Sequence, residues 1–229
     1  MQFEGRKFQR FYDQDSAATF SDLEFSKCAF WSSAISITVK PHLRSTVRNV
    51  KFINCEQRGC ALDTAIVEDV LVDGFKTNGL FQTWGAVFKH VTLRGKIGRL
   101  MISPMVSTAM AKPHEQRAFD EANGAYYESV DWALDISAAE FEEIDIRGVP
   151  ARLIRRDSES QAVVTRAKAM EGAWRKLDLG KTDWGGWIDL FLQSGEMDVV
   201  LTAPKRHRKY REHLEGLKVL REAGVAEAE

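Results

Sequence analysis

The 229-residue sequence lacks the segments that send a protein into or across a membrane. No run approaches the roughly 18 apolar residues that a membrane-spanning helix needs. The N-terminal residues are charged and contain no apolar core, so we expect no signal peptide. The three cysteines, Cys28, Cys55 and Cys60, form no Cys-x-x-Cys pair. These absences predict a reduced, cytoplasmic compartment and no contact with a membrane.

The sequence also lacks a charge excess of either sign. It carries 32 Lys and Arg residues against 33 Asp and Glu residues, a formal net charge of −1. The first 156 positions and the remaining ones are each nearly balanced when counted separately. A whole-domain nucleic-acid binder normally shows a clear basic excess, and a mimic of nucleic acid shows an acidic one. The balance found here argues against both classes.

The common sequence signatures of catalysis and cofactor binding are missing as well. There is no Gly-rich phosphate loop, no nucleophile elbow and no cluster of metal-ligating residues. His114-Glu115 opens a predicted helix, but no second histidine follows four residues after the first, so the zinc-protease motif is incomplete. We therefore expect no cofactor and no metal ion.

What the sequence does contain is a short cassette that recurs along its first two-thirds. Each copy holds an apolar residue, a polar pair, an apolar residue, one spacer and a further apolar residue. The copies begin at Phe20, Val47, Val67, Phe88 and Phe141. The two middle spacings are nearly equal, the first is somewhat longer and the last is much longer. Such a period, with alternating polar and apolar positions, predicts a solenoid whose turns each contain several short strands.

Stacking of the turns would place equivalent residues about 4.8 Å apart in straight files. The cassette predicts an inward ladder of Leu23, Val50, Val70, Val91 and Ile144. A second predicted file consists of Cys28, Cys55, Phe75, Lys96 and Val149. A recurrent corner is predicted at Asn54, Gly74, Gly95 and Gly148. Gly and Asn suit a corner because they tolerate left-handed backbone angles, and buried cysteine acts as a small core residue.

Two copies of the cassette resemble a known repeat. Ser21-Asp22-Leu23-Glu24-Phe25 and Arg48-Asn49-Val50-Lys51-Phe52 are similar to units of pentapeptide-repeat proteins. The resemblance covers residues 3–102 and 131–156, with one matching unit per turn. It implies a right-handed, four-sided parallel β-helix in which four such units make one turn. Members of that family include mimics of nucleic acid and protein scaffolds, and the resemblance carries over no catalytic residues.

Two segments interrupt the repeat. In residues 103–130, Lys112-Pro113 predicts a helix from His114 to Asn123 that Gly124 closes. After Arg156 the apolar residues follow a helical period. The helices predicted there begin at Ser158, span 183–194 and span 205–222, with a strand at 199–201.

Together these features predict a mainly β fold with an α-helical cap. Residues 1–156 are expected to form a right-handed parallel β-helix, a solenoid of about five coils, interrupted by a helical excursion at 103–130. Residues 157–229 are expected to form a helix-rich α/β C-terminal cap, because the open end of a solenoid must be covered.

Three functions remain open on this evidence. We favour a non-enzymatic cytoplasmic interaction or scaffold protein, because a regular repeat offers a protein partner a surface rather than a pocket. The first alternative is a carbohydrate-active β-helical enzyme that uses Asp63 and Asp135, provided that the fold places both carboxyls in one groove. The second is nucleic-acid binding through Arg206, Arg208, Lys209 and Tyr210 of the basic run 205–211.

Overall fold

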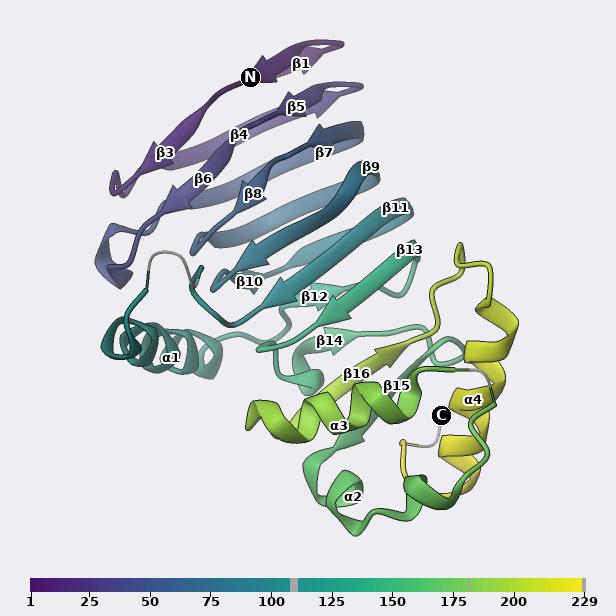
Figure 1. Cartoon of the computed structure of the whole chain (residues 1–229). Helices are drawn as coiled ribbons and strands as arrows, with labels where there is room; N and C mark the ends of the chain where they lie inside the picture. Colours follow the sequence, from purple (N-terminus) through teal and green to yellow (C-terminus); the bar gives the residue numbers. More distant parts are fainter. Residues whose placement is uncertain (108–110, 181, 228–229) are drawn as a thin grey trace.

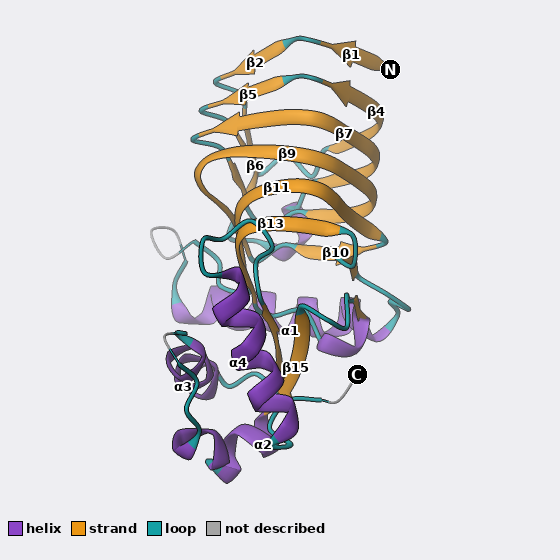
Figure 2. Cartoon of the chain, turned by 90° about the vertical axis from the view of Figure 1, so that its right-hand side faces the viewer, coloured by secondary structure: helices purple, strands orange, loops and turns teal. Residues whose placement is uncertain are grey.

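The computed structural model describes residues 1–107, 111–180 and 182–227, and this part of the chain is mainly β. It contains a 14-stranded parallel sheet, a two-stranded antiparallel sheet and four α-helices (Figure 1). The large sheet curls through 208° into a half-barrel (Figure 2). Its first strands lie at one end of the molecule, and helices α2, α3 and α4 lie at the other (Figures 1 and 2). The predicted mainly β, parallel character is confirmed, but the sheet is not closed into a coil.

The large sheet combines short strands with long ones. Its strands are β1 (Gln2–Glu4), β2 (Lys7–Gln9), β3 (Tyr12–Gln14), β4 (Thr19–Ser26), β5 (Ala29–Trp31), β6 (Ala34–Ile37), β7 (Thr46–Arg58), β8 (Ala61–Leu62), β9 (Ile66–Trp84), β10 (Val87–Lys89), β11 (Val91–Ser103), β12 (Leu134–Asp135), β13 (Ala139–Ile146) and β14 (Ile154–Arg155). The path β1-β4-β7-β9-β11-β12-β14 forms one row. The pairs β2–β5–β7 and β3–β6–β8–β9 form two further rows, so the long strands β7 and β9 bend from one row into the next.

The predicted spacing between turns appears in the strand register. Leu23 pairs with Val50 and Val50 pairs with Val70, which are the steps that the first three cassettes predict. Leu71 pairs with Thr92, so Val91 continues the file after Val70. Val50, Val70 and Val91 are all buried. The first four rungs of the predicted ladder are therefore confirmed.

The fifth rung was assigned to the wrong residue. Val91 pairs with Leu134, which is fully buried, whereas Ile144 pairs with Leu100 in another part of β11. The number of residues between paired positions on either side of the 103–130 excursion is thus smaller than the cassettes predict. The error has a physical origin: strands of different rows share similar patterns of apolar and polar residues, so an apolar pattern identifies a strand but not its row.

The second file needs the same correction. Cys55 pairs with Phe75, but Phe75 pairs with Ile97 and Ile97 with Phe141. Lys96 pairs with Glu140 and is exposed, and Val149 follows β13 outside this file. Cys28 and Cys55 are buried, and each thiol donates to backbone carbonyls. Burial raises the pKa of the Cys55 thiol, as expected for a core residue.

Two files of corner residues adopt left-handed backbone angles. Asn54, Gly74 and Gly95 have φ values of 51°, 72° and 66°, so the predicted corner is confirmed at these positions. A Cβ atom on Gly74 would lie 2.7 Å from the Asn54 side-chain oxygen, because the corners stack directly on one another. Gly148 also has a positive φ, but it packs against Pro104 and belongs elsewhere. The polar position of the cassette forms the other file: Asp22, Asn49, Asp69 and His90.

Helix α1 (Pro113–Glu128) covers one side of the half-barrel. It begins at Pro113, next to the predicted His114, and continues through Gly124 to Glu128, five residues beyond the predicted end at Asn123. The buried Phe119 ring lies 4.5 Å from the Arg44 guanidinium, which donates to Asn123 and to the Gly85 carbonyl. These contacts attach the helix to residues that precede β7 and β10.

The C-terminal part has a core of its own around a two-stranded sheet. Its elements are β15 (Gln161–Thr165), α2 (Arg166–Glu171), α3 (Trp184–Ser194), β16 (Asp198–Thr202) and α4 (Tyr210–Glu222). Helix α3 and strand β16 lie where they were predicted. Residues 161–165 form a strand instead of a helix, because Val163 packs into the core of the large sheet and Val164 into the second core. Helix α4 begins at Tyr210 rather than at residue 205, so most of the basic run is a turn.

Candidate functional site

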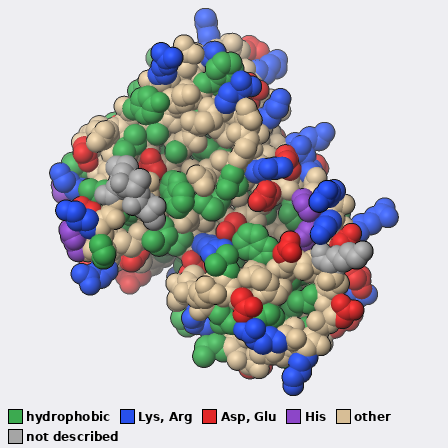
Figure 3. Space-filling model, viewed as in Figure 1, with side chains coloured by type: hydrophobic (Ala, Val, Ile, Leu, Met, Phe, Trp, Pro, Cys, Tyr) green, Lys and Arg blue, Asp and Glu red, His purple; other side chains and the backbone are tan. Residues whose placement is uncertain are grey.

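A cleft of about 150 Å³ opens between the end of the large sheet and the C-terminal part. Strand β13 supplies one wall, and α3, β16 and the turn before α4 supply the others. On the face shown in Figure 3, acidic, basic and histidine side chains lie around hydrophobic ones in this region. The lining includes Glu142, Glu143, Asp145, Arg147, Asp183, Trp184, Trp187, Phe191, Glu196, His207 and His213.

The wall formed by β13 presents an acidic and a basic group side by side. The strand alternates, so the buried Ile146 points into the core while Asp145 faces the cleft. Arg147 Nε lies 3.1 Å from Asp145 Oδ2, and both side chains are less than one-fifth exposed. Burial raises the pKa of Asp145, and the Arg147 guanidinium opposes that rise. Asp145 is therefore a buried carboxylate that already has a cationic partner.

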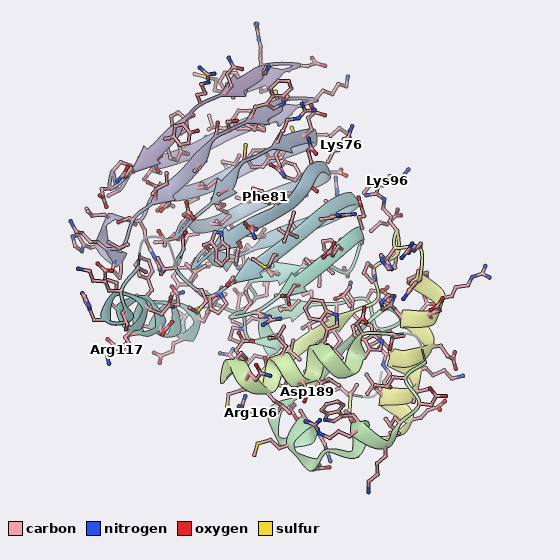
Figure 4. The ribbon with its side chains drawn as sticks, in the orientation of Figure 1. Lys76, Phe81, Lys96, Arg117, Arg166 and Asp189 are labelled. Carbon is pink, nitrogen blue, oxygen red and sulfur yellow. The ribbon has the colours of Figure 1, made fainter. Side chains whose placement is uncertain are left out.

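The cleft holds a second carboxylate, Glu196, near Arg147 and Asp145, and one of its oxygens has no such partner among the described residues. Gly195, with φ 81°, ends α3 and leads into Glu196. The Arg166 guanidinium holds this bend by donating to the carbonyls of Glu196 at 2.9 Å and Leu192 at 2.7 Å (Figure 4). Glu196 Oε1 is buried and accepts no hydrogen bond from any residue that the structure describes. Burial raises the pKa of Glu196 to about 7, against the opposing charge of Arg147.

Helix α3 supplies the aromatic surface of the cleft. Trp184 is 3% exposed and donates from its indole nitrogen to the His213 carbonyl at 3.0 Å. A Cβ atom on Gly216 of α4 would lie 2.6 Å from the Trp184 ring, so glycine permits this close approach. Trp187, three residues further along the helix, is half-buried, and its ring centre lies 5.8 Å from the Arg147 guanidinium. Trp187 is thus the aromatic side chain that a ligand can reach.

Two histidines close the side of the cleft nearest α4. The His207 and His213 rings lie 5.1 Å apart, and His213 Nδ1 is 2.8 Å from the Lys209 carbonyl. Burial lowers the pKa of His207, and its interactions with the neighbouring His213 and Arg208 lower it further. His207 is therefore neutral at pH 7, and it adds no positive charge to the cleft.

The charge in the cleft is mainly negative. Among the residues that the structure describes, its lining contains five carboxylates, at Glu142, Glu143, Asp145, Asp183 and Glu196, against the single guanidinium of Arg147. Arg99, outside the lining, lies 2.9 Å from Glu142 and 3.7 Å from Glu143 and offsets part of that charge. An acidic wall facing an aromatic surface can bind a cation or a polar ring. Among the described residues, no group of His, Cys, Asp and Glu is placed to hold a metal ion.

No family model, curated protein or solved structure matches the chain. Within the described ranges, no helix has both the length and the apolar character needed to cross a membrane.

The two carboxylates suggested by the sequence, Asp63 and Asp135, lie in different rows of the sheet. Asp63 follows β8, which pairs with β6 and with the end of β9. Asp135 lies in β12, pairs with Thr92 and Arg155, and accepts hydrogen bonds from Ser137. Burial raises the pKa of Asp63 to about 6. The structure does not bring the two carboxyls together.

The residues of the basic run have mixed environments. Arg206 donates to the Ile97 carbonyl, and its backbone N–H donates to the Phe141 carbonyl. Arg208 is exposed, and Tyr210 packs against the second core. Lys209 follows Arg208 in the turn and is half-buried. The run therefore attaches the turn before α4 to the large sheet and exposes Arg208 to solvent.

The main residues of the cleft were missed at the level of the sequence. Asp145 occupies the spacer position of the last cassette, and Trp184 and Trp187 lie in the helix predicted at 183–194, where Trp184 is buried. One feature of the sequence points to Glu196: it directly follows the glycine that ends α3. That signal marks a turn but does not reveal that β13, which lies far earlier in the sequence, stands opposite.

Proposed function

We propose that this protein is a non-enzymatic interaction or scaffold protein that binds a protein partner at the cleft. The curled sheet serves as the frame, which we interpret as a right-handed parallel β-helix of about five coils. The file Phe3, Phe25, Phe52, Val72 and Leu93, which advances by a similar step from strand to strand, supports that interpretation. The observation that carries the functional proposal is the cleft that the half-buried Trp187 and the unpartnered Glu196 oxygen line together with strand β13.

The arrangement of the cleft favours binding over catalysis. Asp145 is occupied by Arg147 at 3.1 Å, and the two rings of His207 and His213 contact each other. A general acid–base pair needs two groups free to reach the substrate from defined positions. Aromatic side chains beside hydrogen-bonding groups are instead typical of the centres of protein interfaces.

One observation favours a second candidate, an acid–base enzyme acting on a polysaccharide. Glu196 has a pKa of about 7, which suits a group that exchanges a proton at neutral pH. Trp187 would then stack on a sugar ring. This candidate predicts turnover of a sugar polymer that the Glu196→Gln variant loses.

The experiment combines partner capture with reconstitution. A partner captured by the full-length protein is purified, and its affinity is measured by calorimetry for wild type, Trp187→Ala and Arg117→Ala. Arg117 is the control because it lies on α1, away from the cleft (Figure 4). We expect Trp187→Ala to weaken binding by about tenfold or more, as is common for a central aromatic residue, and Arg117→Ala to leave it unchanged. Equal affinities for all three proteins, or turnover of a sugar polymer without any partner, would contradict the proposal.

A further inference from the structure

We infer that the cleft receives a basic side chain, an arginine or lysine, from an extended segment of the partner. This inference rests on the proposed function and specifies the chemistry of the partner at the same site. Three properties of the cleft carry it: its charge, an acceptor that lacks a donor, and its size.

The charge of the cleft selects a cation. Its carboxylates outnumber its one guanidinium, and Arg147 is already engaged with Asp145. An anionic ligand would meet Glu142, Glu143 and Glu196, and Arg99 offsets only part of the negative charge of the first two. A cation instead restores the balance between positive and negative groups in the cleft.

The unpartnered acceptor shows where the cation would bind. A buried carboxylate oxygen that accepts no hydrogen bond costs free energy, and a guanidinium or ammonium group removes that cost. Glu196 Oε1 is such an oxygen among the described residues, and Arg166 fixes the backbone behind it. The side chain lines the cleft but this oxygen is covered, so the Glu196 side chain must turn toward the cleft to meet the cation. The neighbouring Arg147 already combines contact with a carboxylate and contact with Trp187. The incoming cation would likewise contact a carboxylate, that of Glu196, and the Trp187 ring.

The size of the cleft limits the ligand to one side chain. A volume of about 150 Å³ accommodates a group of the size of one benzene ring. A helix or a folded strand does not enter such a space, whereas a guanidinium with part of its aliphatic stem does. The remainder of the partner segment must then lie across the rim, where β13 carries Glu142 and Glu143.

The test uses short peptides and the full-length protein. Acetylated and amidated pentapeptides of alanine carry arginine, lysine, citrulline, leucine or glutamate at the centre. Their binding is followed by the fluorescence of the protein's tryptophans and by heteronuclear shift mapping of the indole N–H groups. Citrulline is the matched control because it keeps the shape of arginine and removes the charge.

We expect the arginine and lysine peptides to bind and to shift the Trp187 signal. The citrulline peptide should bind about tenfold more weakly, since a charge-assisted pair is lost. Glu196→Gln should weaken the arginine peptide by about fivefold or more, whereas Asp189→Asn should not. Asp189 lies on the same helix but outside the cleft, 2.6 Å from Arg175 (Figure 4).

Four outcomes would overturn the inference, and they separate it from the proposed function. Equal binding of the arginine and citrulline peptides removes the cation requirement, as does preference for the leucine or glutamate peptide; in both cases a peptide-binding cleft remains. If free arginine binds as tightly as the arginine peptide, the cleft is a small-molecule site, and the proposal of a protein partner is contradicted. A Trp187 signal that no peptide shifts contradicts both the inference and the proposed docking site.

Discussion

At the scale of single residues, the carboxylate of Glu196 links the cleft to the stability of the fold. Its ordinary pKa is 4.5, and burial raises it to about 7 in the folded chain. Between these values the folded state binds more protons than the unfolded state, so stability falls as the pH rises through this window. Arg147 and the backbone N–H of Gly148 oppose the shift, while the negative charges of Asp145 and Asp198 add to it.

We therefore expect Glu196→Gln to stabilise the protein above pH 7. The variant removes the cost of a buried charge, so its melting temperature should exceed that of wild type by a few degrees at pH 8. At pH 4 both side chains are uncharged, and the two melting temperatures should agree. Thermal unfolding followed by circular dichroism across this range provides the measurement. A variant that is less stable at pH 8 would show that Glu196 is well paired in the folded state.

His90 also makes the stability of the fold depend on pH. In this case the protonated side chain stabilises the fold through contacts with two carboxylates. His90 Nδ1 lies 3.0 Å from Asp69 Oδ1, and His90 Nε2 lies 2.7 Å from Asp131 Oδ1. The hydrogen bond with Asp131 is the main cause that raises the pKa of His90 above its ordinary value of 6.5, and the bond with Asp69 adds to it. This contribution is fully present below pH 6.5 and is lost as the pH rises through the raised pKa.

The variant His90→Asn tests this contact. Asn tolerates the left-handed φ of 55° at this position, as Asn49 does in the same file of corners. We expect the variant to fold, to be slightly less stable than wild type at pH 6 and to equal it at pH 8.5. Because the site is exposed, the difference should shrink at high salt. A pH-independent difference would mean that packing against Trp132, 4.8 Å away, matters more than charge.

At the scale of secondary-structure elements, the sequence predicts strands better than it predicts their partners. The files through Val50 and Cys55 and the corner at Gly74 followed from a fixed period, because each residue repeats the backbone geometry of the turn before it. The period stops at the excursion, and the spacing between the cassettes at Phe88 and Phe141 then indicated an offset that the sheet does not use. When two rows of the sheet share the same sequence pattern, only the three-dimensional contacts determine which row a strand joins.

The corrected register makes a prediction about two apolar residues. Leu134 is fully buried in the file that continues from Val91, whereas Ile144 is half-buried. Leu134→Ala should lower the free energy of unfolding by about 2–5 kcal/mol and Ile144→Ala by clearly less, since less surface is lost from the core. Denaturant unfolding of both variants provides the comparison. A larger loss for Ile144→Ala would support the register that the cassettes indicated.

At the scale of the whole molecule, the C-terminal part completes the large sheet rather than standing beside it. Val163 and Val200 extend the core of the half-barrel, while Val164 and Leu201 belong to the second core. A cap over the end of the sheet was predictable, because an open edge must be covered. The cleft was not predictable, since it depends on how β13 and α3 approach each other, and the sequence of neither element contains that information.

The shared strands lead us to expect that the protein unfolds as one unit. The antiparallel pair of β15 and β16 places alternate side chains in the two cores, so neither core can open without exposing the other. Val163→Ala and Val164→Ala should each cost about 1–3 kcal/mol and lower a single melting temperature. Calorimetry detects the number of transitions, and the fluorescence of Trp174 and Trp184 reports on the second core. If Val164→Ala melted the second core first, with a separate heat peak, the two parts would be independent, and the cleft between them would open and close with the stability of the smaller one.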